Sequence, residues 1–349
     1  MNKAAGRNPL VVPTLLFMVL IVVAHNVLGL GQEHDTRVSK RQNAVQQWVY
    51  EEYQSVGIDH AALLAAMTVG TRTKELKEAR ATYSTAGVAH ILALSGLHIG
   101  FVYSLLYLIT LRRRHNPMAL TITLCALWLY VVMTGAAAST VRAGLMVTLH
   151  AMAVMLRRPP MPYNILAAAA LLILAVDPMQ LYTLGFQLSF LSVTFILFYV
   201  PILMPRVGNP LLRWLCASMA VSLAAQIGVT PLLAKVFHQL PTYFLVANIV
   251  VVTAAMVIIY MAAAVVMLHP IPLLQEWMAK GLNWLLNSTD AYIHNIAEMP
   301  HASIHAEINT GQTVCAYTVL IALGLILKLL IMRFKPRNDS YEDKSMQFG

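Results

Sequence analysis

Two histidines and a serine stand inside an apolar stretch of the chain. The run GVAHILALSGLHIG, residues 87–100, contains His90, Ser95 and His98. Ser95 and His98 are three residues apart, a spacing that brings side chains together on a helix. A serine beside a histidine can be a nucleophile and its base, but no acidic residue accompanies the pair and no G-x-S-x-G pattern surrounds the serine. Two interpretations therefore stay open, a hydrolytic site and the lining of a polar path.

A single arginine near the start of another apolar run is the second candidate. Arg142 stands in TGAAASTVRAG, among alanines and close to Ser139. Small neighbours let helices approach closely or leave space beside a guanidinium group, which can hold a phosphate through paired donors. An ion pair with Asp177, or a side chain that extends to the membrane surface, would explain the same residue.

Other apolar runs contain isolated polar residues. An interhelical hydrogen bond would explain any one of them, but several on neighbouring helices favour a hydrated path. The predicted path residues are His90, Ser95, Gly96, His98, Ser139, Arg142, Gln187, Ser189, Gln226, Lys235 and Asn248.

The elements that hold these residues are predicted to be membrane helices. Hydrophobic residues make up 58% of the 349 residues and charged residues 11%, whereas about one quarter of a soluble domain is charged. Apolar runs of bilayer length follow one another, and backbone groups in lipid must be paired within helices. The sequence therefore predicts an all-α, polytopic bundle of transmembrane helices with short interfacial helices. Segment 87–98 is too short to span a bilayer, and Ser95-Gly96 predicts a break, so a re-entrant or broken helix is expected there.

Composition divides the chain into four parts. Residues 1–31 predict an N-terminal membrane anchor, 32–86 an extracytoplasmic or interfacial helical segment, 87–333 the membrane domain, and 334–349 a polar tail. Within the membrane domain, residues 271–299 have one polar and one apolar face, which predicts an amphipathic helix at the interface.

Basic residues orient the helices. Arginines at 112–114, 157–158 and 206–213 fall at alternate ends of consecutive apolar runs, so all three groups can lie in the cytoplasm. Residues 31–86 are then outside. After residue 268 the rule holds only if the amphipathic segment crosses the membrane; otherwise the last apolar run ends outside with its basic residues.

Several function classes lack their motifs. The sequence contains no G-x-x-x-x-G-K-[ST] and no H-E-x-x-H, which argues against a P-loop motor and against a metal hydrolase of that type. The three cysteines, Cys125, Cys216 and Cys315, stand in separate apolar runs without metal-ligand spacing. No metal and no cofactor are expected.

Four ordered blocks of the sequence resemble the competence domain of the ComEC family. They are GVAHILALSGLHIG, YVVMTGAAASTVRAGLM, DPMQLYTLGFQLSF and AAQIGVTPLLAKVFHQLPTYFLVAN. The resemblance covers about residues 60–270. It implies a channel that passes single-stranded DNA across the bacterial cytoplasmic membrane during natural transformation, and it implies no catalytic residue in this domain, so the chain is not expected to be an enzyme.

The resemblance also implies partners. Single-stranded DNA and membrane lipids would contact the chain, and a DNA receptor, a separate nuclease and a cytoplasmic helicase would act with it. Longer members of the family carry an OB-like and a metallo-β-lactamase-like domain, for which 31–86 and 334–349 are too short. A transporter of another anionic solute or lipid precursor is the alternative function, and an intramembrane hydrolase is the third.

Overall fold

The structure is a computed structural model that describes residues 35–71, 73, 75–110, 117–205 and 207–334. The predicted anchor at 1–31 and nearly all of the predicted tail at 334–349 lie outside the described residues. Helices make up most of the described part, with one pair of three-residue strands. The prediction of an all-α polytopic protein is confirmed.

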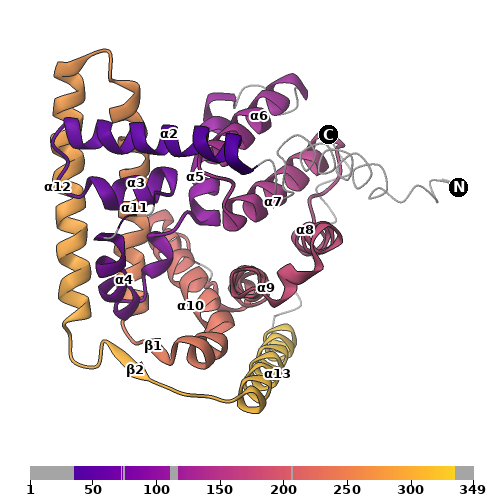
Figure 1. Ribbon diagram of the computed structural model, residues 1–349. Coiled ribbons are helices and arrows are strands. Elements are labelled where there is room, and N and C mark those ends of the chain that lie inside the picture. Colours follow the sequence, from indigo (N-terminus) through magenta and orange to yellow (C-terminus); the bar gives the residue numbers. More distant parts are fainter. Residues whose placement is uncertain (1–34, 72, 74, 111–116, 206, 335–349) are drawn as a thin grey trace, which may run out of the picture.

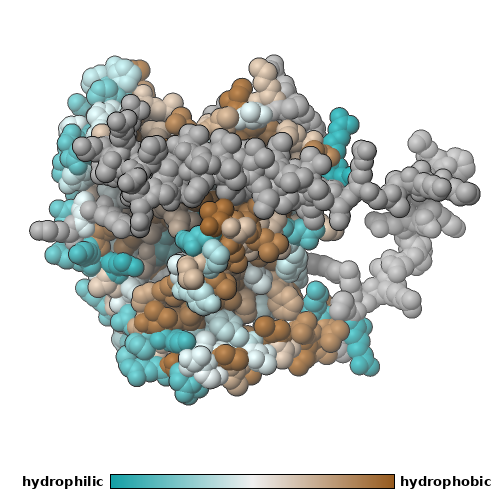
Figure 2. Space-filling model, turned by 45° about the vertical axis from the view of Figure 1, so that its right-hand side comes forward, coloured by the Kyte–Doolittle hydropathy of each residue, from teal (hydrophilic) through white to brown (hydrophobic). Residues whose placement is uncertain are grey.

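Five helices of the described part are long and apolar enough to cross a membrane. They are α7 (Ala138–Met155), α9 (Leu184–Leu203), α10 (Pro210–Phe237), α11 (Phe244–Met267) and α13 (Thr310–Phe334). Three shorter apolar helices accompany them, namely α5 (Gly96–Thr110), α6 (Pro117–Met133) and α8 (Pro162–Val176). The chain is a membrane protein, and large apolar side chains such as Trp214, Val257 and Leu329 are exposed on its surface. Figure 2 shows hydrophobic residues gathered over the middle and lower right of one face, with hydrophilic residues at the left edge and lower rim.

The helices form two groups (Figure 1). One group combines α11 with α12 (Pro272–Ala297) and with three N-terminal helices, α2 (Asp35–Ser55), α3 (Ala61–Val69) and α4 (Glu75–Thr85). Their apolar side chains share one large core, to which Leu64 and Ile293 contribute fully buried side chains. The other group contains α5 to α9, and α10 packs against α9.

Helix α3, within the segment predicted to be extracytoplasmic or interfacial, is packed against protein on nearly all sides. All but one of its nine residues are buried. Its many alanines leave room for close packing, and it lies against α2 and α11. Contact with protein therefore explains the apolar composition of this helix.

Contacts at both ends of α11 hold the N-terminal segment beside it. At one end, the buried Glu52 of α2 accepts a hydrogen bond from Gln275 and lies 2.7 Å from Nδ1 of His269, which follows α11. At the other end, Gly87 has a φ of +81°, and an added Cβ would stand 2.9 Å from Cβ of Pro241. Only glycine accommodates both this backbone conformation and this close approach. The N-terminal segment therefore contacts the chain at both ends of α11.

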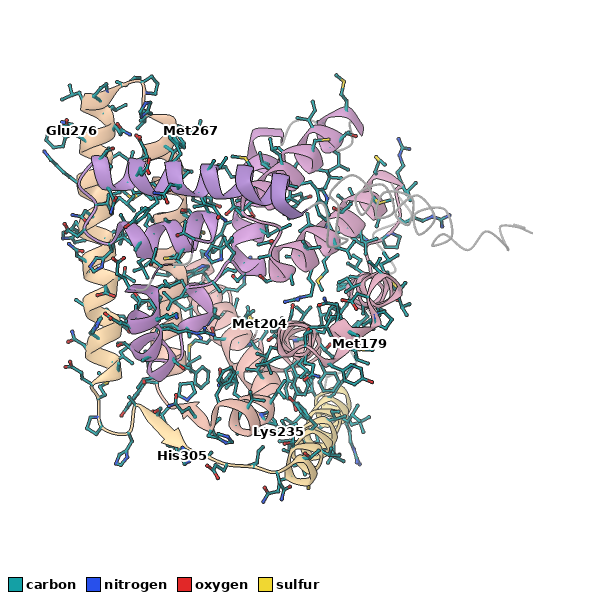
Figure 3. All side chains as sticks on the ribbon, in the orientation of Figure 1. Met179, Met204, Lys235, Met267, Glu276 and His305 are labelled. Carbon is teal, nitrogen blue, oxygen red and sulfur yellow. The ribbon has the colours of Figure 1, made fainter. Side chains whose placement is uncertain are left out.

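The amphipathic segment is a helix, as predicted, but its apolar face meets protein. Leu282 and Leu286 of α12 are buried in the core that α12 shares with α11. In Figure 3, Met267 and Glu276 lie in the upper part of the molecule, whereas Lys235 and His305 lie in the lower part. Helix α12 thus runs back along α11 (Figure 1).

A strand pair closes this hairpin of helices. Strand β1 (Gln239–Pro241) precedes α11, and β2 (Ser303–His305) follows α12, with Gln239 opposite His305 in an antiparallel register. Helix α12 returns the chain to the end of the molecule at which α11 begins. Helix α13 therefore begins at the same end at which α10 finishes. Two membrane topologies were left open after residue 268. This path of the chain agrees with the one in which the amphipathic segment crosses the membrane.

The expected break within 87–98 is present. A single 3-10 turn, η1 (Ala89–Ile91), follows Gly87, and α5 begins only at Gly96. Four residues without helical structure separate η1 from α5. A second 3-10 turn, η3 (Pro178–Tyr182), joins α8 to α9.

Candidate functional site

Ser95 and His98 form a cap at the start of α5. The hydroxyl of Ser95 lies 2.8 Å from Nδ1 of His98, and the backbone N–H of Ser95 donates to the same nitrogen at 3.2 Å. The pair resembles a capping box, in which the side chain three residues into a helix reaches back to the N-cap residue. A local role in starting α5 therefore explains their contact.

This cap also fixes the proton on the ring of His98. A backbone N–H can only donate, so Nδ1 must carry the lone pair, and a neutral ring then carries its proton on Nε2. The side chain is 1% exposed, and Nε2 is buried without a hydrogen-bond partner in the described part of the chain. Such orphan donors are rare in folded proteins, so this N–H is available to an acceptor.

Ser139 joins the cap to α7. Its hydroxyl donates a hydrogen bond to the carbonyl oxygen of Leu94, in the irregular segment before α5. Nearby, a Cβ added to Gly96 would stand 3.4 Å from Cβ of Ala143. The first turns of α5 and α7 therefore lie against each other.

Arg142 points from α7 toward α9. It is 6% exposed, and its Nε is buried without a hydrogen-bond partner among the described residues. A Cβ added to Gly185, in the first turn of α9, would stand 3.6 Å from Nη2 and 4.0 Å from Nη1 of Arg142. The guanidinium group thus lies against the backbone where α9 begins.

The predicted ion pair between Arg142 and Asp177 is wrong. Asp177 instead caps η3, since its carboxylate accepts hydrogen bonds from the backbone N–H of Met179 at 3.0 Å and from the side chain of Gln180 at 2.9 Å. A short acidic side chain before a proline finds these local donors first. Over the described ranges, no carboxylate lies within 4 Å of the guanidinium group of Arg142.

The structure does not bring the other predicted path residues into this cluster. The amide of Gln187 donates to the carbonyl oxygen of Leu181, and that of Gln226 to Thr230 in the same helix. Lys235 lies in the last turn of α10, beside β1 (Figure 3).

Three further predicted path residues lie outside this cluster. Ser189 is half-buried in α9, and His90 is exposed in η1. Asn248 is buried in α11, and its Oδ1 has no hydrogen-bond partner in the part of the chain that the structure describes. Asn248 is therefore a second, separate unsatisfied polar group.

Sequence reasoning missed one feature of the cluster, the carbonyl oxygen of Leu94, because a backbone group has no sequence signal. Gly185 belongs to the block DPMQLYTLGFQLSF, one of the four that carry the family resemblance.

The described side chains offer no group of three metal ligands from His, Cys, Asp and Glu. The arrangement is suited to a different task. Orphan donors on His98 and Arg142 favour an acceptor that carries negative charge.

Comparisons with known proteins identify the family. No solved structure matches the chain. ComE operon protein 3 of Bacillus subtilis (strain 168) is 34% identical over 182 residues, which are 52% of this chain and 23% of that protein. The matched region thus spans less than a quarter of the relative. The Competence protein family matches residues 67–331, and the chain belongs to this family.

Proposed function

We propose that this chain forms the path by which a single strand of DNA crosses the bacterial cytoplasmic membrane, as a multi-pass protein of that membrane. Membership in the competence family supports a role in competence DNA uptake. The observation that carries the finer proposal is the buried Arg142, which has no carboxylate partner among the described residues. A path for single-stranded nucleic acid needs cationic groups for phosphates and no readout of bases.

The proposal includes partners. In line with the resemblance to the ComEC family, we assign to other proteins the capture of DNA outside, the degradation of one strand and the pulling of the other. These partners are a DNA receptor, a nuclease and a cytoplasmic helicase. The proposal assigns no catalytic step to this chain.

Uptake of labelled DNA into the cytoplasm tests the function. Deletion of the gene should abolish import, and Arg142→Glu should lower it at least ~10-fold, because the substitution places a carboxylate beside the strand's phosphates. Arg142→Lys keeps the charge but loses the paired donors, so it should retain part of the activity. Arg213→Glu, at an exposed position at the start of α10, is the matched control. Normal import in the deletion strain would refute the proposal.

Transport of a lipid precursor is the second candidate function, and one observation favours it. A groove of about 360 Å³ lies between α7, α8 and α9 and is lined mainly by apolar side chains, among them Met146, Ile165 and Val193. Such a groove suits an acyl chain better than a nucleotide. Accumulation of a lipid intermediate in the deletion strain, with DNA import unchanged, would favour this function.

Replacement of Ser95 tests the interpretation that the chain is a hydrolase. In a hydrolase of this kind, Ser95→Ala would abolish activity. If the serine is only a helix cap, the variant should lose about 0.5–2 kcal/mol of stability and keep its DNA import. Import rate and thermal unfolding of the same preparation separate these outcomes.

A further inference from the structure

Three helices begin at one place in the molecule. Helix α5 begins at Gly96, α7 at Ala138 and α9 at Leu184. The hydrogen bond from Ser139 to the carbonyl oxygen of Leu94 joins the first two starts. The contact of the Arg142 guanidinium group with Gly185 joins the second to the third. The three N-terminal ends therefore surround the first two turns of α7.

This convergence concentrates positive charge. The N-terminus of each helix carries the equivalent of about half an elementary charge, and all three helices are at least 15 residues long. The N-cap residue of α7, Ala137, has no side chain that could accept a hydrogen bond from the free N–H groups. The charge of Arg142 adds to these partial charges.

The described part of the chain does not neutralise this charge. Arg142 is more than nine-tenths buried, its Nε has no partner, and none of the ion pairs involves it. Burying a cation without a counter-charge is costly. An anion at this position would remove that cost and receive hydrogen bonds from a charged donor.

We infer that the junction of α5, α7 and α9 is a binding site for one phosphate group, held by Arg142 beside the first turn of α9. This inference rests on the proposed function and deepens it, since the phosphate would be a phosphodiester of the translocating strand. Helix N-termini are common anion sites, and arginine matches the oxygens of phosphate with paired donors. A second buried donor without a partner in the described part, Nε2–H of His98, belongs to the first turn of α5.

Gly185 places no side chain against the guanidinium group of Arg142. A methyl group at this exposed residue would stand 3.6 Å from Nη2, an ordinary contact distance, and would take up space beside the donors. A larger side chain would take up more of that space, and neither change removes Arg142.

The purified full-length protein in a neutral detergent provides the test. Inorganic phosphate, compared with chloride at equal ionic strength, should raise the unfolding temperature in a saturable manner. The phosphate affinity should fall ~10-fold or more in Arg142→Gln, because a charged donor is lost, and comparably in Gly185→Val. Gly185→Ala serves if the valine variant does not fold. Gly100→Ala is the matched control, since a Cβ at Gly100 meets no atom within 4 Å.

A competition experiment identifies the source of the phosphate. An oligothymidylate should displace inorganic phosphate from the wild-type protein, whereas phosphatidylglycerol in nanodiscs should not. Displacement by phosphatidylglycerol alone would overturn the assignment to DNA. Equal stabilisation of wild type and Arg142→Gln by phosphate would overturn the site itself.

The two proposals fail separately. If phosphate binding depends on Arg142 but the deletion strain imports DNA normally, the proposed function fails and the site stands. If import requires the gene but Arg142 and Gly185 variants bind phosphate as the wild type does, only the site fails.

Discussion

Buried polar side chains of this protein fall into two kinds. Glu52 and Tyr83 have partners more than 200 residues away in the sequence, Gln275 and Asp290, and they fix the N-terminal helices to α12. Arg142 instead has a buried polar atom without a partner in the described part. Since buried polar groups are normally satisfied, the first kind stabilises the fold, and the second is the observation on which the proposed phosphate site rests.

Tyr83 predicts a loss of stability at alkaline pH. Its hydroxyl donates to the carboxylate of Asp290 at 2.9 Å. Burial first, and then the charge of Asp290, raise the pKa of Tyr83 above its ordinary value of 10.0. Because the folded-state pKa lies above the unfolded one, the stabilisation is complete below about pH 10 and is lost as the pH rises beyond it.

Tyr83→Phe tests this dependence. The variant should be about 1 kcal/mol less stable at pH 8, because a hydrogen bond is lost, and its stability should fall less steeply above pH 10. Thermal unfolding between pH 8 and 11 measures both effects. Tyr50→Phe, whose hydroxyl only accepts a hydrogen bond from Gln54 in the same helix, is the control. Equal alkaline slopes for wild type and Tyr83→Phe would contradict the prediction.

The sequence predicted several residues of the cluster but not the contacts that these residues make. Ser95, Ser139 and Arg142 were predicted as functional because each interrupts an apolar run, and the structure brings them to one region. Asp177 was a possible ion-pair partner of Arg142 on grounds of charge. The structure excludes this explanation because a local cap satisfies the carboxylate. Such competition between local and distant partners cannot be judged from a charge pattern.

At the scale of elements, α9 and α10 pack so closely that one glycine is indispensable. A Cβ added to Gly228 of α10 would stand 2.8 Å from Cβ of Phe195 and 3.1 Å from the carbonyl oxygen of Leu191. Neither atom can move without shifting α9.

Gly228→Ala should therefore lower stability by about 1–3 kcal/mol through overpacking. Gly100→Ala, also within an apolar helix, has free space and should be neutral or up to ~1 kcal/mol stabilising. Thermal or urea unfolding of the purified variants compares them. A Gly228→Ala protein as stable as wild type would show that the two helices are not in this close contact.

The sequence identified the long apolar helices but did not show what covers α3 and α12. Periodicity shows that one face of a helix is buried, and it does not tell protein from lipid. Helix α3 buries all but one of its residues, and α12 buries its apolar face, in a core formed by residues about 200 positions apart. No local pattern reports such a contact.

At the scale of the whole molecule, the path of the chain predicts which ends share a side. Glu276 and Glu307 are exposed residues near opposite ends of α12. After replacement of the three native cysteines, Glu276→Cys should react with a membrane-impermeant thiol reagent from one side of the membrane, and Glu307→Cys from the other. The positive-inside rule places Glu276 in the cytoplasm. Labelling of both positions from one side would show that α12 does not cross.

The core shared by α2, α3, α4, α11 and α12 also constrains biosynthesis. The ribosome completes residues 45–92 well before residues 247–296, which bury them. At a synthesis rate of about 5–20 residues per second, roughly 10 to 40 s pass between completion of the first part and completion of the second. During that time the apolar side chains of α3 have no partner from α11 or α12. A nascent chain stopped before α11 should therefore be a preferred target of proteases and chaperones.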